Sequence, residues 1–491
     1  MEHGDPAVWA SAFAALLVFA SLVTPLSRRL GVPALLLFLV LGMLAGSEGI
    51  GGIPLDDYEL VYQLGSAALV LILFNGGLHT PPAMLRRTAG PALLLSTVTV
   101  LATAAIVAAA AWALGVPPAI AVLTGAVVSP TDAAAVFSVL GSSGVRLREG
   151  TRATLEVESG LNDPMAVLLT VVATDAILRG VRPDAATALL LALQAGVGVL
   201  GGLACGWGGR WLLRRGELPA AGLYPVLTTA IAFGAFGLTA LYHGSGYLAV
   251  YLAGVILGDG RLPHRSTVRG FHEGLAWLAQ VAMFLLLGLL AFPSKLWPVA
   301  GAGLGIALVL AFVARPVAVL LALAPFSYLR AERVFVAWVG LRGAVPIVLA
   351  TYPVILGVPG GDHVFHLVFF VVLATSLLPG ATVAWLARRL GLDSGLPPAP
   401  EPRVELVSHR EGPGDFVWYL VTPASAVAGA TVDELPLPDG CRIVLLLRGD
   451  DVVPLAADTV LRADDHACVL VPAGERGFVD LVFGRVQAVD V

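Results

Sequence analysis

The chain has 491 residues, of which 57% are hydrophobic and 13% are charged, about half the roughly 25% charged share of soluble domains. Its mean hydropathy of +0.87 excludes a soluble globular protein and indicates a protein that crosses a membrane many times. The net charge of -5 is unevenly divided, because residues 398–491 carry 15 acids and 7 bases while the preceding residues carry 19 acids and 22 bases. The composition therefore predicts an apolar part followed by a smaller acidic part.

Thirteen apolar segments are long enough to be transmembrane helices, because a bilayer core ~30 Å thick needs about 20 residues. They lie at about 7–25, 33–48, 60–79, 91–114, 118–140, 152–178, 186–213, 221–242, 245–259, 272–291, 296–325, 332–355 and 363–388. Arginines gather after every odd-numbered segment, from Arg28 and Arg29 to Arg388 and Arg389. The positive-inside rule then predicts a multi-pass membrane protein with its N-terminus outside and its C-terminus in the cytoplasm.

Two of the predicted spans combine a charge with a helix breaker near the middle of the membrane. In 118–140, Pro130 precedes Thr131 and Asp132, and in 332–355 glycine and proline residues flank Arg342. Proline removes a backbone donor and clashes with the preceding turn, so both helices should be interrupted. The spans run in opposite directions, seven spans apart, as the paired broken helices of inverted repeats do in secondary transporters. We expect Asp132 at a positive helix N-terminus and Arg342 at a negative C-terminus.

The span at 152–178 offers several oxygen atoms on one face. Glu156, Ser159 and Asp163 are spaced i, i+3 and i+7, so they share a side of the helix. Carboxylate, hydroxyl and freed backbone carbonyl oxygens suit a monovalent cation, and burial favours the protonated form of an acid. One acid that accepts either a cation or a proton can exchange the two. Asp163 is the candidate, and the neutral Asn162 lies beside it.

Other intramembrane charges have structural interpretations. Glu158 and Arg342 are expected to form a buried ion pair, which would make part of this cluster a salt-bridged network. Asp175 is expected to pair with Arg179 one turn later near the end of its helix. Arg315 is expected to be a packing or pairing residue.

The acidic part begins with a proline-rich stretch at 393–402, which favours an extended linker. In residues 403–491, segments at 416–421, 442–447 and 467–471 are rich in β-branched residues and are bounded by Asp-Gly and Gly-Asp turns. The sequence thus predicts a small α+β cytoplasmic domain at 403–491 after an all-α membrane domain at 1–392. The three cysteines have no disulfide or zinc spacing, and we expect no cofactor.

The strings "SPTDAAAV", "ESGLNDPMAV" and "LRGAVPIVLA" resemble the bacterial monovalent cation/proton antiporters of the sodium/hydrogen exchanger family. The resemblance is to the NhaP-type potassium/proton branch, or cell volume regulation proteins, and the tail resembles the TrkA-C (RCK-C) regulatory domain. It implies that Asp163 binds the cation and the proton, with Ser159 and the Thr131 backbone as further ligands. It also implies that Asn162 steadies the site and that Asp132 compensates a helix dipole.

The same resemblance implies that Arg342 pairs with Glu158, and that the protein is a homodimer in which a core of broken helices slides against a scaffold. The tail would bind a small ligand or nucleotide. One departure stands out, because relatives carry an acid where this chain has Asn75 in "FNGGLHT".

We therefore expect electroneutral exchange of K⁺ for H⁺ by alternating access, serving cation, pH and cell volume homeostasis. Na⁺/H⁺ exchange with little K⁺ transport is the first alternative. A potassium channel would need a Thr-Val-Gly-Tyr-Gly filter, and an intramembrane enzyme would need a motif such as His-Glu-x-x-His; the sequence contains neither. We expect no enzymatic activity and no nucleic-acid partner; the expected partners are membrane lipid, the transported ions, a second copy of the chain and a regulatory ligand.

Overall fold

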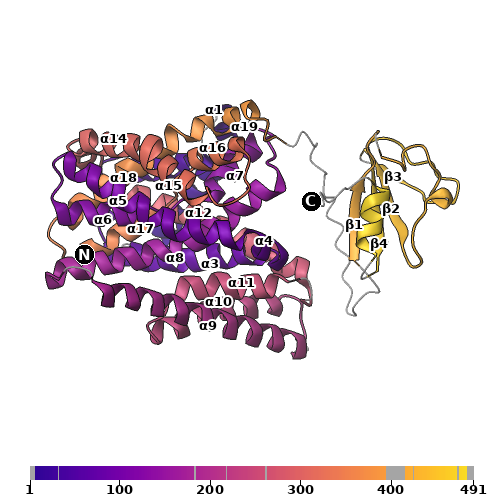
Figure 1. Cartoon of the computed structure of the whole chain (residues 1–491), viewed down its shortest axis with the longest axis horizontal. Coiled ribbons are helices and arrows are strands. Elements are labelled where there is room, and N and C mark those ends of the chain that lie inside the picture. The colour runs from indigo at the N-terminus through magenta and orange to yellow at the C-terminus, as the bar shows by residue number, and fades with distance from the viewer. Residues whose placement is uncertain are drawn as a thin grey trace. The chain divides into compact units, whose positions relative to one another are not determined.

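The structure, a computed structural model, describes residues 6–30, 33–181, 184–216, 218–259, 262–393, 415–423, 425–449, 451–472 and 475–483. The chain forms two compact units, Met1–Gly395 and Leu396–Val491. The first unit is helical, and the second contains a four-stranded sheet and a short helix (Figure 1). This confirms the predicted fold class of a helical membrane protein with a small C-terminal α+β domain.

Most helices of the first unit coincide with predicted spans. They are α1 (Pro6–Leu30), α2 (Ala34–Ala45), α3 (Tyr58–His79), α4 (Pro82–Leu94), α5 (Val100–Ala113), α6 (Pro118–Val128), α7 (Ala133–Ser142), α8 (Glu149–Arg179), α9 (Ala185–Arg215), α10 (Leu223–Leu241), α11 (Gly246–Gly258), α12 (Arg265–Leu289), α13 (Pro293–Leu296), α14 (Ala300–Val309), α15 (Arg315–Ala322), α16 (Arg330–Trp338), α17 (Val345–Ile355), α18 (Gly361–Leu377) and α19 (Val383–Arg389).

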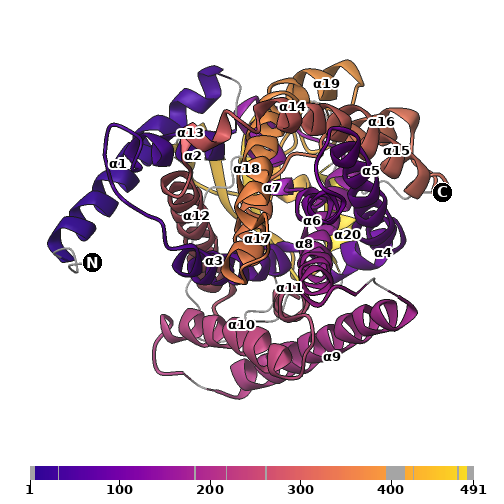
Figure 2. The same ribbon diagram turned by 90° about the vertical axis from the view of Figure 1, so that its left-hand side faces the viewer.

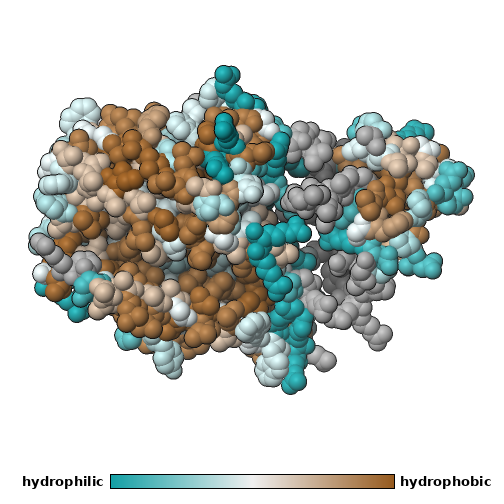
Figure 3. Space-filling view, in the orientation of Figure 1, coloured by the Kyte–Doolittle hydropathy of each residue, from teal (hydrophilic) through white to brown (hydrophobic). Residues whose placement is uncertain are grey.

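Apolar residues cover much of the visible face of this unit (Figure 3). Among the described residues, eight helices are long and apolar enough to cross a membrane, and the bent pair α6 and α7 makes a ninth. The remaining predicted spans coincide with α1, α2, α11 and α17, whose apolar stretches have only 10–17 residues. The total of thirteen spans therefore stays a prediction.

Glycines let one group of helices approach closely. A methyl group on Gly42 or Gly288 would collide with the facing backbone between α2 and α12, and the same holds for Gly77 and Gly254 between α3 and α11. α9 packs on α11, and α9 and α10 lie side by side at the edge of the bundle (Figure 2). We call α1–α3 and α9–α12 the scaffold, because α2 packs closely on α12 and α3 on α11, and α1, α9 and α10 pack against these helices.

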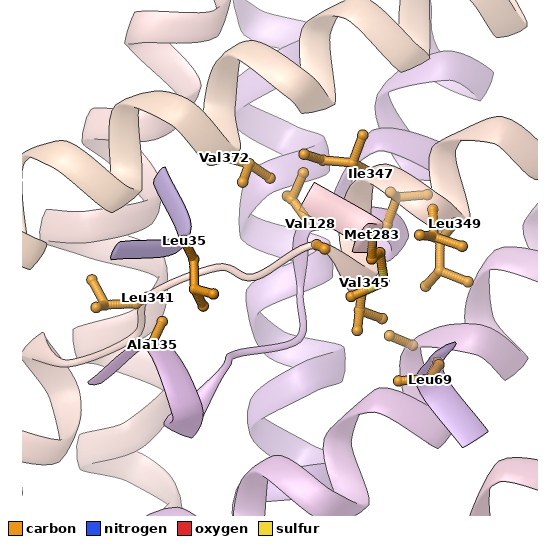
Figure 4. Close-up of a cluster of buried hydrophobic side chains, with 14 of the residues drawn as sticks. Leu35, Leu69, Val128, Ala135, Met283, Leu341, Val345, Ile347, Leu349 and Val372 are labelled. Carbon is orange, nitrogen blue, oxygen red and sulfur yellow. The ribbon is translucent and has the colours of Figure 1, made fainter. Parts of the chain in front are cut away.

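Helices α4–α8 and α14–α18 form what we call the core. Both predicted helix breaks are confirmed here: α6 and α7 meet at a 49° bend, and residues 339–344 separate α16 from α17. Two π-helical turns, Leu95–Thr99 after α4 and Leu310–Ala314 after α14, interrupt further core helices. Apolar side chains such as Val128, Leu341 and Val345 surround the two broken segments (Figure 4).

The second unit has an antiparallel sheet of order β1-β4-β2-β3. Its elements are β1 (Asp415–Leu420), β2 (Arg442–Arg448), β3 (Asp451–Val453), β4 (Asp465–Val471) and α20 (Arg476–Val482). Val479 of α20 joins a buried apolar cluster with residues of β1, β2 and β4. The predicted strands are confirmed, whereas the proline-rich linker from residue 394 onward lies outside the described residues.

Candidate functional site

The two broken segments hold each other together at their ends. The backbone N–H of Asp132 donates to the carbonyl of Leu341 at 2.8 Å, and Nε of Arg342 donates to the carbonyl of Val128 at 3.1 Å. Each break leaves backbone groups without helical partners, which is costly inside a membrane. The opposite segment supplies partners for some of them, so the two breaks form one structural unit.

The charges lie at the helix ends that suit them. Oδ1 of Asp132 accepts hydrogen bonds from the N–H groups of Ala134 at 2.8 Å and Ala135 at 3.3 Å, so Asp132 is the N-cap of α7. Arg342 faces the carboxyl end of α6 through Val128 and also donates to the carbonyl of Gly340. Each side chain thus places its charge against the helix end of opposite polarity.

The middle of α8 is tied to the first break through Thr131. Oγ of Ser159 donates to the Thr131 carbonyl at 3.2 Å and accepts from the N–H of Ala133 at 3.1 Å. Nδ2 of Asn162 donates to the same carbonyl at 3.2 Å and to Oγ1 of Thr131 at 2.8 Å. Two donors already occupy the Thr131 carbonyl oxygen, so a cation that uses this oxygen must displace one of them.

A cavity of about 460 Å³ lies between the core and the scaffold. The predicted residues Asp163, Ser159 and Asp132 line it, together with Asn75. Within the described part of the chain, no group donates a hydrogen bond to the Asp163 carboxyl group. This carboxyl group is therefore free to take a cation or a proton from the cavity.

Thr131 and Asn162 are buried and are not among the residues that line the cavity. The structure therefore brings all five predicted site residues close together, but they have different surroundings. Asp163, Ser159 and Asp132 line the cavity, whereas Thr131 and Asn162 are buried beside the first break and hydrogen-bond to each other.

The expected ion pair between Glu158 and Arg342 is wrong. Glu158 pairs with Arg315, whose Nη1 and Nη2 lie 2.5 Å and 3.0 Å from Oε1 and Oε2. Both side chains are almost fully buried, and Oγ1 of Thr131 also donates to Oε1 at 3.4 Å. Arg342 contacts backbone carbonyls instead, because its position in the break places it beside the ends of the helix halves. Its Nε and Nη1 donate to Val128 and Gly340, and its buried Nη2 has no hydrogen-bond partner among the described residues. The expectation that Arg315 packs or pairs is met by its contact with Glu158.

The scaffold contributes cavity residues that the sequence reasoning missed. Tyr251, Gln280 and Glu273 line the cavity from α11 and α12, and His79 lines it from the end of α3. Gln280 had a detectable signal, because it is the sole polar residue in the apolar run at 275–290. Among the described residues, no group of three or more His, Cys, Asp or Glu side chains is arranged to hold a metal ion.

The chain is similar to proteins of a known family. Residues 15–389 match the family model described as the sodium/hydrogen exchanger, transmembrane, and residues 416–475 match the TrkA-C domain. The chain is 40% identical to the K(+)/H(+) antiporter NhaP2 of Shewanella oneidensis, over 93% of this chain and 80% of that protein. It is also 40% identical to the K(+)/H(+) antiporter NhaP of Alkalimonas amylolytica, over 80% of this chain and 68% of that protein.

More distant relatives also match a large part of the chain. The Na(+)/H(+) antiporter NhaP of Pseudomonas aeruginosa is 30% identical over 66% of this chain and 80% of that protein. The structure of the sodium proton antiporter MjNhaP1 from Methanocaldococcus jannaschii superimposes with a TM-score of 0.67 at 26% identity, covering 78% of this chain and 99% of that one. The chain therefore belongs to the sodium/hydrogen exchanger family.

Proposed function

We propose that the protein exchanges K⁺ for H⁺ across the membrane, with Asp163 as the group that binds either ion. The observation that carries this proposal is the Asp163 carboxyl group, which faces the cavity at the crossing of the broken helices without a hydrogen-bond donor. The names of the 40%-identical relatives favour K⁺, and those of the more distant ones keep Na⁺ as the alternative. The protein acts as a transporter and not as an enzyme.

The exchange is electroneutral. The other acids near Asp163 have fixed tasks, since Asp132 caps α7 and Glu158 pairs with Arg315. Asn162 cannot titrate. One proton therefore leaves Asp163 for each cation that binds, with Ser159 as a second oxygen ligand and Thr131 as a third after one of its donors is displaced.

Alternating access follows from the two groups of helices. The cavity lies between core and scaffold residues, so a movement of the core along the scaffold would carry Asp163 from one side of the membrane to the other. The cavity reaches Arg152 and Glu273, near the starts of α8 and α12, on the arginine-rich side. This side is the cytoplasmic one in a bacterial inner membrane, with the N-terminus outside and the C-terminus inside.

Two further properties belong to this proposal. The protein is a homodimer joined through its scaffold. Its TrkA-C domain binds a small ligand or nucleotide and changes the rate of transport through a different affinity for the two core positions.

The test uses everted vesicles that carry a pH-sensitive dye. Addition of K⁺ should collapse an imposed proton gradient more effectively than addition of Na⁺. Asp163→Asn should abolish the response while the protein remains folded and inserted. Asp175→Asn on the same helix is the matched control, because Asp175 pairs with Arg179 away from the cavity and should be dispensable. Full exchange by Asp163→Asn would refute the proposal.

A further inference from the structure

An arginine lies on the route that a cation would take to Asp163. Arg152, near the start of α8, lines the cavity, and its Nε donates to Oε1 of Glu156 at 2.8 Å. The side chains of Arg152 and Glu156 are 60% and 23% exposed. The guanidinium also lies 5.6 Å from the centre of the Phe137 ring, which lines the same cavity. A positive charge here is unexpected, because it repels the ion that the cavity admits.

Helix geometry aligns this pair with Asp163. Glu156 precedes Asp163 by seven residues, or about two helical turns, which puts their side chains on one face roughly 10 Å apart along the axis. Arg152 lies one turn further toward the arginine-rich side. Since all three residues line one cavity, an ion entering from that side passes Arg152 and Glu156 before it reaches Asp163.

The Arg152–Glu156 ion pair can break without a large cost. An ion pair between neighbouring turns of a helix, with its arginine largely exposed, is weak and exchanges with ions from solution. The Phe137 ring offers the Arg152 guanidinium a second favourable contact, because the face of an aromatic ring attracts cations. The Glu158–Arg315 pair is different, as it is buried and holds two hydrogen bonds. Glu156 is thus a carboxylate on the ion route whose partner can move aside.

We propose that Glu156 is a second, transient cation site at the mouth of the cavity, and that Arg152 is the internal cation that competes for it. This inference rests on the proposed exchange at Asp163. An entering K⁺ displaces the guanidinium from the Glu156 carboxylate, and the guanidinium moves toward Phe137. The ion then passes to Asp163, and Arg152 returns to Glu156. The pair limits how readily cations load at low concentration.

The test is the KM for K⁺, measured from the cytoplasmic side at about pH 9, where protons compete least. Arg152→Gln should lower KM roughly two- to fivefold with little change in Vmax, the size expected when a weak ion pair that competes with K⁺ for Glu156 is removed. Glu156→Gln should raise KM, since it removes the site and leaves the arginine. Arg179→Gln, which breaks the similar Arg179–Asp175 pair at the other end of α8, is the control and should leave KM unchanged.

A double-variant cycle separates a cation site from a general effect of charge. If cations bind Glu156, most of the gain from Arg152→Gln should disappear in the Glu156→Gln background. An equal gain in both backgrounds, or no gain in either, would overturn the proposal. The Asp163→Asn result is independent: if that variant stays inactive while the Arg152 effect is absent, the exchange mechanism stands and the second site does not.

Discussion

Arg315 holds Glu158 at two points in the middle of the core, with Nη1 to Oε1 at 2.5 Å and Nη2 to Oε2 at 3.0 Å. The side chains are 3% and 1% exposed. Removal of Arg315 from this buried pair would leave the charge of Glu158 uncompensated. Removal of Arg342 would leave no such charge, because Arg342 interacts with uncharged backbone carbonyls. The two buried arginines should therefore differ in what they contribute to stability.

Arg315→Ala should destabilise the protein by about 3–5 kcal/mol, the usual cost of breaking a buried pair. Arg342→Ala should cost less, since it leaves carbonyl groups and no buried charge unpaired. Arg179→Ala, in an exposed pair, should cost only about 0–1 kcal/mol. Thermal unfolding followed by fluorescence-detected gel filtration measures all three. A lower melting temperature for Arg342→Ala than for Arg315→Ala would contradict this order.

Gly160→Ala should impair transport, because a methyl group at this position would collide with the ring of Tyr251 on the scaffold. Overpacking of this kind costs about 1–3 kcal/mol, and here it falls on the contact between the core and the scaffold. Gly150→Ala lies on the same helix with nothing within 4 Å and is the control. The measurement is the transport rate of the Gly160→Ala and Gly150→Ala proteins in vesicles. Recovery of activity in Gly160→Ala with Tyr251→Ala would identify the collision as the cause.

Transport should carry no net charge, because Asp163 alone changes its proton content in the cycle. In liposomes, a membrane potential set with valinomycin and K⁺ should leave the initial rate of Na⁺/H⁺ exchange unaltered. If Na⁺ is not transported, K⁺/H⁺ exchange in liposomes without valinomycin, with the potential set by a gradient of a membrane-permeant anion, provides the same comparison. A rate that rises steeply with voltage would require a second charge-carrying group.

A chain that ends at Gly395 should still exchange ions, with altered regulation. Asp393 belongs to the membrane unit, since its Oδ1 accepts from the N–H of Arg146 at 3.2 Å and its backbone pairs with Leu147. The end must therefore lie beyond this residue. Truncation before Asp393 removes these contacts and is the comparison for stability. A well-inserted but inactive protein ending at Gly395 would show that the TrkA-C domain is needed for transport itself.

The Arg448–Asp465 pair should stabilise the TrkA-C domain throughout the neutral range. Burial disfavours ionisation of Asp465, but hydrogen bonds from Arg448 and the backbone of Arg462 outweigh it and lower its pKa below the ordinary 3.8. A lowered folded-state pKa adds stability that is present above 3.8 and is lost as pH falls through the folded-state value.

Hydrogen exchange of the β4 amides in the full-length protein, corrected for intrinsic rates, should therefore be constant between about pH 6 and 9. Arg448→Ala should raise that exchange at every pH in the range. A loss of protection between pH 7 and 6 in the parent protein would mean that another group controls this domain.

Helix-breaking chemistry made the two broken helices predictable. Pro130 and the residues around Arg342 mark interruptions that depend on local sequence alone. The partner of Glu158 could not be predicted in the same way, because two arginines, Arg315 and Arg342, are buried in the core. The rotation of each helix about its axis decides which one faces the acid. The direction of the Asn162 amide toward Thr131 likewise depends on where the first break passes α8.

The scaffold side of the cavity was the least predictable part of the site. Tyr251 and His79 look like ordinary helix residues until α3 and α11 pack against α8. The π-helical turn that precedes Arg315 has no simple sequence signal either. Local rules therefore identify the core elements, and tertiary packing decides which side chains meet.

The hydrogen bonds between the two breaks also constrain how the protein is made. Val128 and Arg342 are 214 residues apart, so the ribosome needs roughly 10 to 40 s at 5–20 residues per second to produce the second after the first. Throughout that interval the segment around Asp132 lacks its partners, and a polar backbone without partners does not sit stably in lipid. We therefore expect the segment around Asp132 to remain hydrated or shielded by other proteins until residues 339–344 have been made, and the two breaks to settle in the bilayer together.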